Sequence, residues 1–160
     1  MSSSFKIRNA CLEDTPLILQ MIRELADFEQ LLDQVTTDQP TLRHSLFSDP
    51  KAPEVLIAEE NKHPVGFVLF FHNFSTFLGR KGIYIEDLYV RQEYRGKGYG
   101  DLILKEICRL AKIRNCGRVE WWVLDWNERA INFYKKIGAT PMSDWTVFRL
   151  TEESIHRLIR

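Results

Sequence analysis

Residues 83–113 read IYIEDLYV RQEYRGKGYG DLILKEICRLAKI, which joins a strand pattern to a helix pattern through three glycines at alternate positions. Branched and aromatic side chains dominate Ile83–Val90, and these favour a strand. From Tyr99 to Ile113 the apolar residues recur with a helical period, which is typical of an amphipathic helix. The connecting residues Arg95–Gly100 let the backbone approach a ligand closely, because glycine has no side chain. With the N-terminus of the following helix, they predict an anion site that suits phosphate.

The glycine segment matches neither the Walker A pattern nor the dinucleotide-binding Gly-x-Gly-x-x-Gly pattern. On this segment alone, a glycine-rich turn whose basic residues serve solubility is an equal alternative.

Two acids, Glu86 and Asp87, interrupt the apolar strand just before the glycine segment. Burying carboxylates in a central strand is costly unless they are paired or hydrogen-bonded. We therefore predict a β-bulge that turns both acids towards a water-filled cleft, with simple exposure at a sheet edge as the alternative.

A second cluster of chemistry-bearing residues begins at Asp125-Trp126-Asn127, after another predicted strand. Asn127 can cap a helix that carries Tyr134 one turn inside. An aromatic residue at helical spacing usually packs in the core, so the pattern alone favours packing for Tyr134 over chemistry.

The remaining pattern predicts one domain over residues 1–160 with the element order βααβββαβα, followed by a closing strand. The other expected strands are Phe5–Arg8, Val55–Glu59, Val65–Phe71, Val119–Leu124 and Trp145–Leu150. Four other helices are expected: one that starts at Asp14-Thr15-Pro16 and ends near Glu29, and three over Gln39–Phe47, Asn127–Gly138 and Glu152–Arg160.

Charge and composition exclude several classes of protein. Lys plus Arg and Asp plus Glu number 22 each, so no global field attracts nucleic acid or an anionic membrane. The longest nearly uncharged stretch, Val65–Leu78, is too short to cross a bilayer. The first residues lack an apolar signal region, so we expect a cytoplasmic protein.

Cysteine and histidine usage argues against a disulfide framework and against a metal site. The three cysteines are odd in number and lack Cys-x-x-Cys spacing, so we interpret them as packing residues. The four histidines show no ligand spacing, and no metal is expected.

Taken together, these motifs resemble the GNAT superfamily of acetyl-CoA-dependent N-acetyltransferases over nearly the whole chain. Arg95–Gly100 is similar to its Gln/Arg-x-x-Gly-x-Gly/Ala signature. Further motifs resemble the spermidine/spermine N1-acetyltransferase family, and within it the thialysine N-acetyltransferase branch; these are IRELADFE at 22–29, YIEDLYV at 84–90, Ser75-Thr76, Leu124-Asp125-Trp126-Asn127 and Asn132-Phe133-Tyr134.

The resemblance implies a GNAT fold, with a mixed, mostly antiparallel twisted sheet flanked by helices. It also implies acetyl-CoA as cosubstrate. The residues expected to hold acetyl-CoA are Leu88, Tyr89, Val90, Arg95, Gly96, Lys97, Gly98, Tyr99, Gly100, Asp101, Asn127, Glu128, Arg129, Ala130 and Lys136. Arg91, Arg95 and Lys97 are interpreted as cations for coenzyme phosphates.

The resemblance also implies catalytic roles. Tyr134 is expected to be the general acid that protonates the leaving CoA thiolate, and Glu86 the base that deprotonates the acceptor amine through water. The residues expected in the acceptor cleft are Phe28, Glu29, Ser75, Thr76, Glu86, Asp87, Glu120, Trp121 and Trp122. Aromatic rings suit a cation or a methylene chain, and carboxylates suit its charged ends.

The resemblance implies a small primary amine as acceptor, with thialysine or a related amino acid first and polyamines second. The short Met142-Ser143-Asp144-Trp145 segment replaces an acidic pair of the polyamine enzymes and argues against long polyamines. A homodimer is implied, with Trp145–Leu150 as the segment that crosses between subunits. Two alternatives stay open: a protein amine as acceptor, and a non-catalytic acetyl-CoA-binding regulatory module.

Overall fold

The computed structural model describes residues 4–50 and 53–160, and the chain forms two compact units, Met1–Trp122 (unit 1) and Val123–Arg160 (unit 2). Unit 1 contains five strands, β1 (Phe5–Asn9), β2 (Glu54–Glu60), β3 (His63–Ser75), β4 (Arg80–Val90) and β5 (Val119–Trp121), and three α-helices, α1 (Thr15–Phe28), α2 (Gln39–Phe47) and α3 (Tyr99–Ile113), with 3₁₀ turns η1 (Leu12–Asp14), η2 (Leu32–Gln34) and η3 (Gln92–Tyr94).

The five strands of unit 1 form one sheet in the order β1-β2-β3-β4-β5. The first four strands pair antiparallel, and β5 pairs parallel to β4. The mixed, mostly antiparallel sheet expected from the sequence is therefore confirmed.

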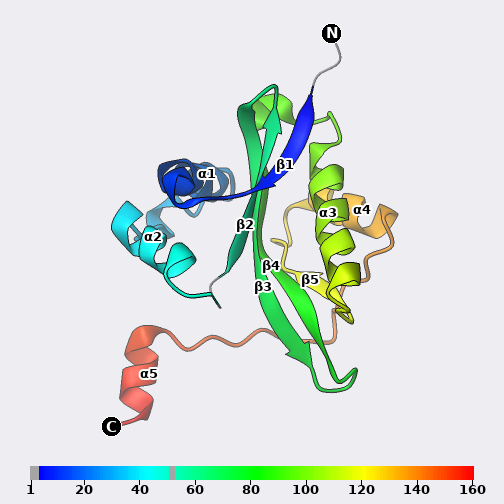
Figure 1. Cartoon of the computed structure of the whole chain (residues 1–160). Coiled ribbons are helices and arrows are strands. Elements are labelled where there is room, and N and C mark those ends of the chain that lie inside the picture. Colours follow the sequence, from blue (N-terminus) through cyan, green and yellow to red (C-terminus); the bar gives the residue numbers. More distant parts are fainter. Residues whose placement is uncertain (1–3, 51–52) are drawn as a thin grey trace. The chain divides into compact units, whose positions relative to one another are not determined.

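Helices cover both faces of the sheet in unit 1, with α1 and α2 on one side and α3 on the other (Figure 1). One core cluster joins α1 and α2 to the first face, and α3 contacts β4 on the second. Because strand side chains alternate, residues of β2 and β3 are buried on both faces. The first cluster comprises Ile18, Leu19, Met21, Leu42, Leu46, Val55, Ile57, Phe67, Leu69 and Tyr89.

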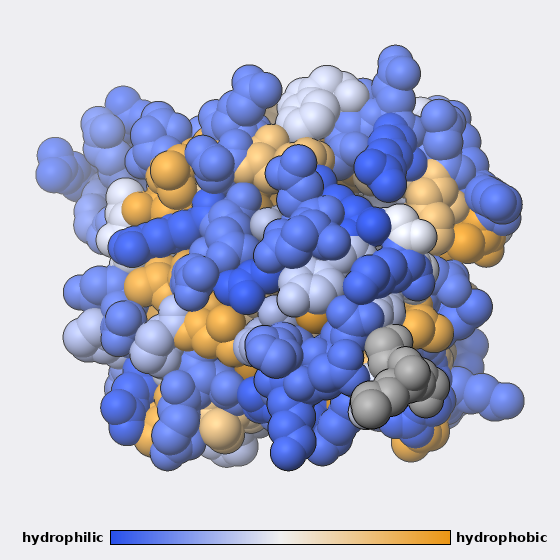
Figure 2. Space-filling model, turned by 90° about the horizontal axis from the view of Figure 1, so that it is seen from above, coloured by the Kyte–Doolittle hydropathy of each residue, from blue (hydrophilic) through white to orange (hydrophobic). Residues whose placement is uncertain are grey.

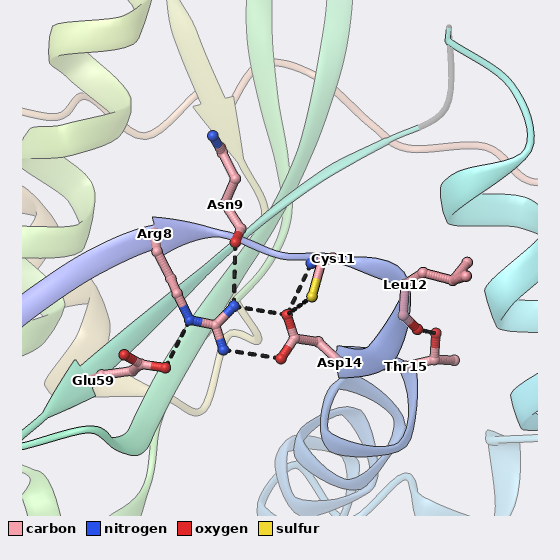
Figure 3. Close-up of polar contacts among 7 residues, drawn as sticks. All are labelled: Arg8, Asn9, Cys11, Leu12, Asp14, Thr15 and Glu59. Carbon is pink, nitrogen blue, oxygen red and sulfur yellow. Dashed lines mark hydrogen bonds and ion pairs between the residues drawn. The ribbon is translucent and has the colours of Figure 1, made fainter.

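A polar cluster fastens the start of the chain to the sheet (Figure 3). The Arg8 guanidinium donates to both Asp14 carboxylate oxygens, at 2.7 and 2.9 Å, and to Glu59 Oε1 at 2.7 Å. The backbone N–H and the thiol of Cys11 donate to Asp14 Oδ2. The Arg8 hydrogen bond holds the pKa of Asp14 at about 2. The cluster thus ties β1, the turn before α1, and β2 together.

The cysteines are free thiols, but the interpretation of all three as packing residues was wrong. Cys11 and Cys108 are exposed, and only Cys116 is partly shielded. Cys11 lies in a turn where its thiol bonds to Asp14, and Cys108 follows the fully buried Ile107 on the solvent side of α3.

Unit 2 contains α4 (Glu128–Lys136) and α5 (Glu152–Leu158). Asn127 caps α4 by accepting a hydrogen bond from the N–H of Ala130, as expected. The predicted strand Trp145–Leu150 does not form. A strand needs a neighbour for its backbone hydrogen bonds, and no residue in the described part of the chain pairs with this segment.

Several other strand bounds differ from those expected, most of all in β3, β4 and β5. The β3–β4 ladder runs further, to Ser75 and Arg80, because cross-strand pairing continues through the polar residues after Phe71. β5 is shorter than predicted, since its pairing with β4 ends at Trp121.

The surface agrees with the balanced composition. On the face seen in Figure 2, hydrophobic residues form separate patches among hydrophilic ones. In the part of the chain that the structure describes, no helix has the length and apolar character needed to cross a membrane.

Candidate active site

A β-bulge at Glu86 reshapes the middle of β4. Asp87 pairs with Leu69, and Ile85 pairs with the next residue of β3, so Glu86 is the extra residue of the ladder. At the bulge Ile85 is buried, Glu86 is exposed and Asp87 is half-buried. The bulge predicted from the two acids is confirmed.

Carboxylates gather at this bulge. Burial, together with the negative charges of Glu86 and Glu29, raises the pKa of Asp87 to about 6. Glu29 directly follows α1, and burial raises its pKa as well. The site therefore carries negative charge that attracts a cation, and one of its carboxyl groups exchanges a proton close to neutral pH.

Aromatic rings flank the acids. Tyr84 pairs with Glu120 across the β4–β5 ladder. Its ring meets Trp122 edge to face, with centroids 5.9 Å apart, and lies 5.2 Å from the Phe71 ring. Burial, then the charges of Glu86, Glu120 and Asp87, raise the pKa of Tyr84 to about 12. Unit 1 thus brings Glu86, Asp87, Glu29, Glu120 and Trp122 into one neighbourhood, and their roles in an acceptor cleft stay a prediction.

Sequence reasoning missed Tyr84 and Phe71 as members of this neighbourhood. The available signal was the position of Tyr84 two residues before Glu86, a spacing that puts side chains on one face of a regular strand. Phe71 gave no such signal, because its proximity to Tyr84 depends on the register of β3 and β4.

The β4 edge next to the bulge is only partly paired. β5 pairs with Ile83–Ile85 alone, whereas β4 continues to Val90. Among the residues described, none continues the β5 side of this ladder along Leu88–Val90. Alternate backbone N–H and C=O groups of this stretch point away from β3 and can bind an extended amide-containing ligand, and the Val90 carbonyl oxygen also accepts from Arg95 Nε.

The glycine segment Arg95–Gly100 follows β4 and η3 and leads into α3. Gly96 and Gly98 have φ of +83° and +81°, which is the left-handed region that favours glycine. A Cβ built on Gly96, Gly98 or Gly100 would meet nothing within 4 Å. The backbone is therefore open to a ligand, and the first N–H groups of α3 lie beside it without intrahelical acceptors.

The cations near the glycine segment contact protein groups, and their interpretation as phosphate-binding side chains stays a prediction. Arg91 forms two hydrogen bonds with Glu24, each 3.0 Å long, and one with the Pro64 carbonyl oxygen. It therefore joins α1 to the end of β4.

Arg95 and Lys97 are engaged in the same way. Arg95 Nε donates to the Val90 carbonyl oxygen at 2.9 Å, and its guanidinium carbon lies 4.3 Å from the Phe28 ring centroid. Lys97 Nζ lies 3.1 Å from a carboxylate oxygen of Glu60. The open backbone, rather than these side chains, is the feature of the segment that suits an anion.

The remaining residues expected to hold coenzyme or to act in catalysis lie in unit 2. Tyr134 is half-buried within α4, and no α4 residue is fully buried, so the pattern-based preference for core packing is not supported. Its ring lies 5.5 Å from the Phe133 ring. Glu128, Arg129 and Lys136 are exposed along the same helix.

Ser75 and Thr76 lie apart from the bulge within unit 1. Ser75 is buried at the β3–β4 turn, where its hydroxyl accepts from the Leu78 N–H at 3.2 Å. It pairs with Arg80, six residues along β4 from Glu86, or about 20 Å at the usual rise per strand residue. Their contribution to acceptor binding stays a prediction.

Comparison with known proteins identifies the family. Residues 19–139 match the acetyltransferase (GNAT) family. The chain is 38% identical to the thialysine N-epsilon-acetyltransferase of Bos taurus, and the match covers 95% of each protein. The chain belongs to the acetyltransferase (GNAT) family. It is an N-acetyltransferase, and enzymes of the GNAT family use acetyl-CoA as cosubstrate.

Two further similarities frame this GNAT enzyme. It is 40% identical to an L-ornithine N5-acetyltransferase of Arabidopsis thaliana, over 82% of this chain and 56% of that protein. An integron cassette protein from the mobile metagenome of V. cholerae has the same fold, with a TM-score of 0.80, 22% identity and 99% of each chain covered. Within the described ranges, no group of three or more His, Cys, Asp or Glu side chains could hold a metal ion.

We expect Gly98→Val to weaken acetyl-CoA binding by about tenfold or more, because a branched side chain would cover the open backbone at the start of α3. Gly79→Val is the matched control, since Gly79 also has positive φ and open space around it but lies in the β3–β4 turn. Calorimetric titration of both folded variants with acetyl-CoA measures the effect. Equal affinities for the two variants would place the coenzyme elsewhere.

Proposed function

We propose that this enzyme transfers the acetyl group of acetyl-CoA directly to a primary amine of a small molecule in a ternary complex. The observation that carries the proposal is the arrangement along β4. The acids Glu86 and Asp87 and the open edge Leu88–Val90 follow one another on β4, and the glycine segment Arg95–Gly100 comes next along the chain after the short turn η3. A nucleophile held at the acids would thus lie beside an acyl donor held at the edge.

The acceptor must lose a proton before it reacts. An alkylammonium with a pKa of ~10.4 is protonated at neutral pH and cannot attack a carbonyl carbon. Exposed Glu86 can take this proton through a water molecule, and Asp87 stabilises the cation before the transfer. The free amine nitrogen then forms a bond to the acetyl carbon, and the bond from that carbon to the CoA sulfur breaks.

The acceptor region favours a short cation with a carbon chain. Phe28, Tyr84 and Trp122 offer rings for methylene groups or an ammonium, and Glu29 offers negative charge, whereas Glu120 forms an ion pair with Arg118. The relatives named for thialysine and L-ornithine act on amino acids with a side-chain amine. We therefore place thialysine or a related amino acid first and polyamines second.

The residues that we propose to contact the coenzyme come from both units. Leu88–Val90 and Gly96–Asp101 would bind the pantetheine arm and pyrophosphate through backbone groups. In unit 2, Asn127–Ala130 and Lys136 would line the rest of the coenzyme, and the Tyr134 hydroxyl would protonate the departing thiolate. The family match spans residues of both units, which supports one domain over residues 1–160.

We infer a cytoplasmic homodimer. Trp145, Val147, Phe148 and Leu150 are exposed on a segment without regular structure, and Phe148 is 92% exposed. A second copy that pairs with this segment would cover these side chains and supply the strand partner that it lacks. The three free cysteines suit a reducing compartment.

A steady-state acceptor screen tests the function. Thialysine, lysine, ornithine, diaminopropane, spermidine, spermine and a lysine-containing peptide are each supplied with acetyl-CoA while thiol release is followed. We expect the highest kcat/KM for thialysine, because its sulfur lowers the basicity of the side-chain amine and leaves more of it unprotonated at neutral pH.

Three other outcomes of the screen would change the proposed acceptor or the proposed activity. A preference for spermine of about tenfold or more would overturn the amino-acid assignment but not the acetyl transfer. A preference for the peptide would indicate a protein acceptor. Acetyl-CoA binding without turnover of any amine would indicate a regulatory module.

We expect Tyr134→Phe to lower kcat about 100-fold while acetyl-CoA affinity stays near wild type, because only the proton donor is removed. Tyr94→Phe is the control, since it removes a tyrosine hydroxyl from η3 instead. Single-turnover thiol release and calorimetry separate the two quantities. Unchanged turnover in Tyr134→Phe would make Tyr134 a packing residue only.

A further inference from the structure

The carboxylate of Glu60, the last residue of β2, binds two side chains of the glycine segment. Lys97 Nζ lies 3.2 Å from Oε1 and 3.1 Å from Oε2, and the Tyr99 hydroxyl donates to Oε1. The Glu60 side chain is only 12% exposed, whereas that of Lys97 is 48% exposed. Glu60 is therefore the less mobile member of its ion pair with Lys97. Lys97 and Tyr99 lie 37 and 39 residues away from Glu60 in sequence.

The same end of the sheet also holds the Tyr99 ring. Phe5 stacks on it with centroids 4.5 Å apart and planes 16° apart. Phe5 is the cross-strand partner of Glu60 in the β1–β2 ladder, and Tyr99 is only 6% exposed. We call Phe5, Glu60, Lys97 and Tyr99 the Glu60 clamp.

Two clamp residues, Lys97 and Tyr99, alternate with the glycines of the segment. The glycines have no side chains that could pack against the sheet. Gly96, Gly98 and Gly100 have open space where a Cβ would be, and a glycine backbone loses more freedom on ordering than any other. Lys97 and Tyr99 stand between them. Their contacts with Glu60 therefore fix the segment relative to the sheet.

We propose that Glu60 is a positioning residue for acetyl-CoA binding. Through Lys97 and Tyr99 it sets the backbone N–H groups of residues 96–100 in place before the pyrophosphate arrives, so that less ordering accompanies binding. Lys97 offsets the negative charge of Glu60, which makes a carboxylate compatible with a nearby phosphate. The proposal rests on the proposed role of the glycine segment as the coenzyme site.

Glu60→Gln tests the proposal, because it keeps the size of the side chain and removes the charge that holds Lys97. We expect the dissociation constant and the KM of acetyl-CoA to rise about fivefold or more, with kcat at saturating acetyl-CoA unchanged. Glu106→Gln is the matched control, since it breaks an ion pair with Arg109 on α3 and none with a residue of the glycine segment. The control should bind acetyl-CoA as wild type does.

A Lys97→Met variant, alone and combined with Glu60→Gln, separates positioning from direct phosphate binding. If Glu60 acts through Lys97, the double variant binds acetyl-CoA no more weakly than Glu60→Gln alone. Additive losses would mean that Lys97 contacts phosphate independently of Glu60 and would overturn the proposal. Should Glu60→Gln fail to fold, Tyr99→Phe removes the other contact and should raise the same KM without changing kcat.

Acetyl-CoA binding by the wild type, measured in the same series, separates the role of the glycine segment from the role of Glu60. No acetyl-CoA binding by the wild type would overturn the proposed role of the glycine segment itself. Wild-type binding together with equal or tighter binding by Glu60→Gln would overturn only the role of Glu60, because its charge would then be neutral or harmful to the coenzyme.

Discussion

The site depends on how β4 is paired. Its ladder with β3 contains one extra residue, Glu86, and its ladder with β5 ends at Ile85. The bulge places adjacent acids at the surface of a sheet that is otherwise apolar at its centre. The early end of β5 pairing leaves backbone groups open directly beyond them. The proposed acceptor site and the proposed coenzyme edge therefore both depend on irregularities of one strand.

Charge is distributed unequally between the two parts of the site. Around the glycine segment each cation is held by a protein group, Arg91 by Glu24 and Lys97 by Glu60, for example. Around the bulge, by contrast, burial and neighbouring carboxylates raise the pKa of Asp87. We expect a cationic acceptor to reduce the repulsion between Asp87 and the neighbouring carboxylates. We expect the anionic coenzyme to bind the backbone N–H groups of the glycine segment. We therefore expect the substrates to neutralise the charges at the site that no protein group neutralises.

Local sequence signals predicted much of this arrangement. The bounds of α2 and α3 agree with their caps and periodicity, and the acids inside an apolar strand indicated the bulge. The Glu60 clamp could not be predicted, because its members are brought together by the pairing of β1 with β2 and by the packing of α3. Trp145–Leu150 has the composition of a strand, but a strand also requires a partner, and composition does not specify one. The contact of Lys97 with Glu60 could not be predicted for the same reason: the sequence neighbours of Lys97 are glycines, and Glu60 is distant in sequence.

The most direct test of this account is the pH dependence of kcat/KM for the acceptor at saturating acetyl-CoA, in the wild type and in Asp87→Asn. Asp87, whose pKa is raised to about 6, is ionised above that pH and becomes protonated as the pH falls through it. The site then loses negative charge that attracts the amine, so the wild-type profile should fall more steeply below about pH 6. Asp87→Asn should lower kcat/KM at neutral pH and displace this acidic limb. A wild-type profile without the limb, or a limb that is identical in Asp87→Asn, would contradict the account.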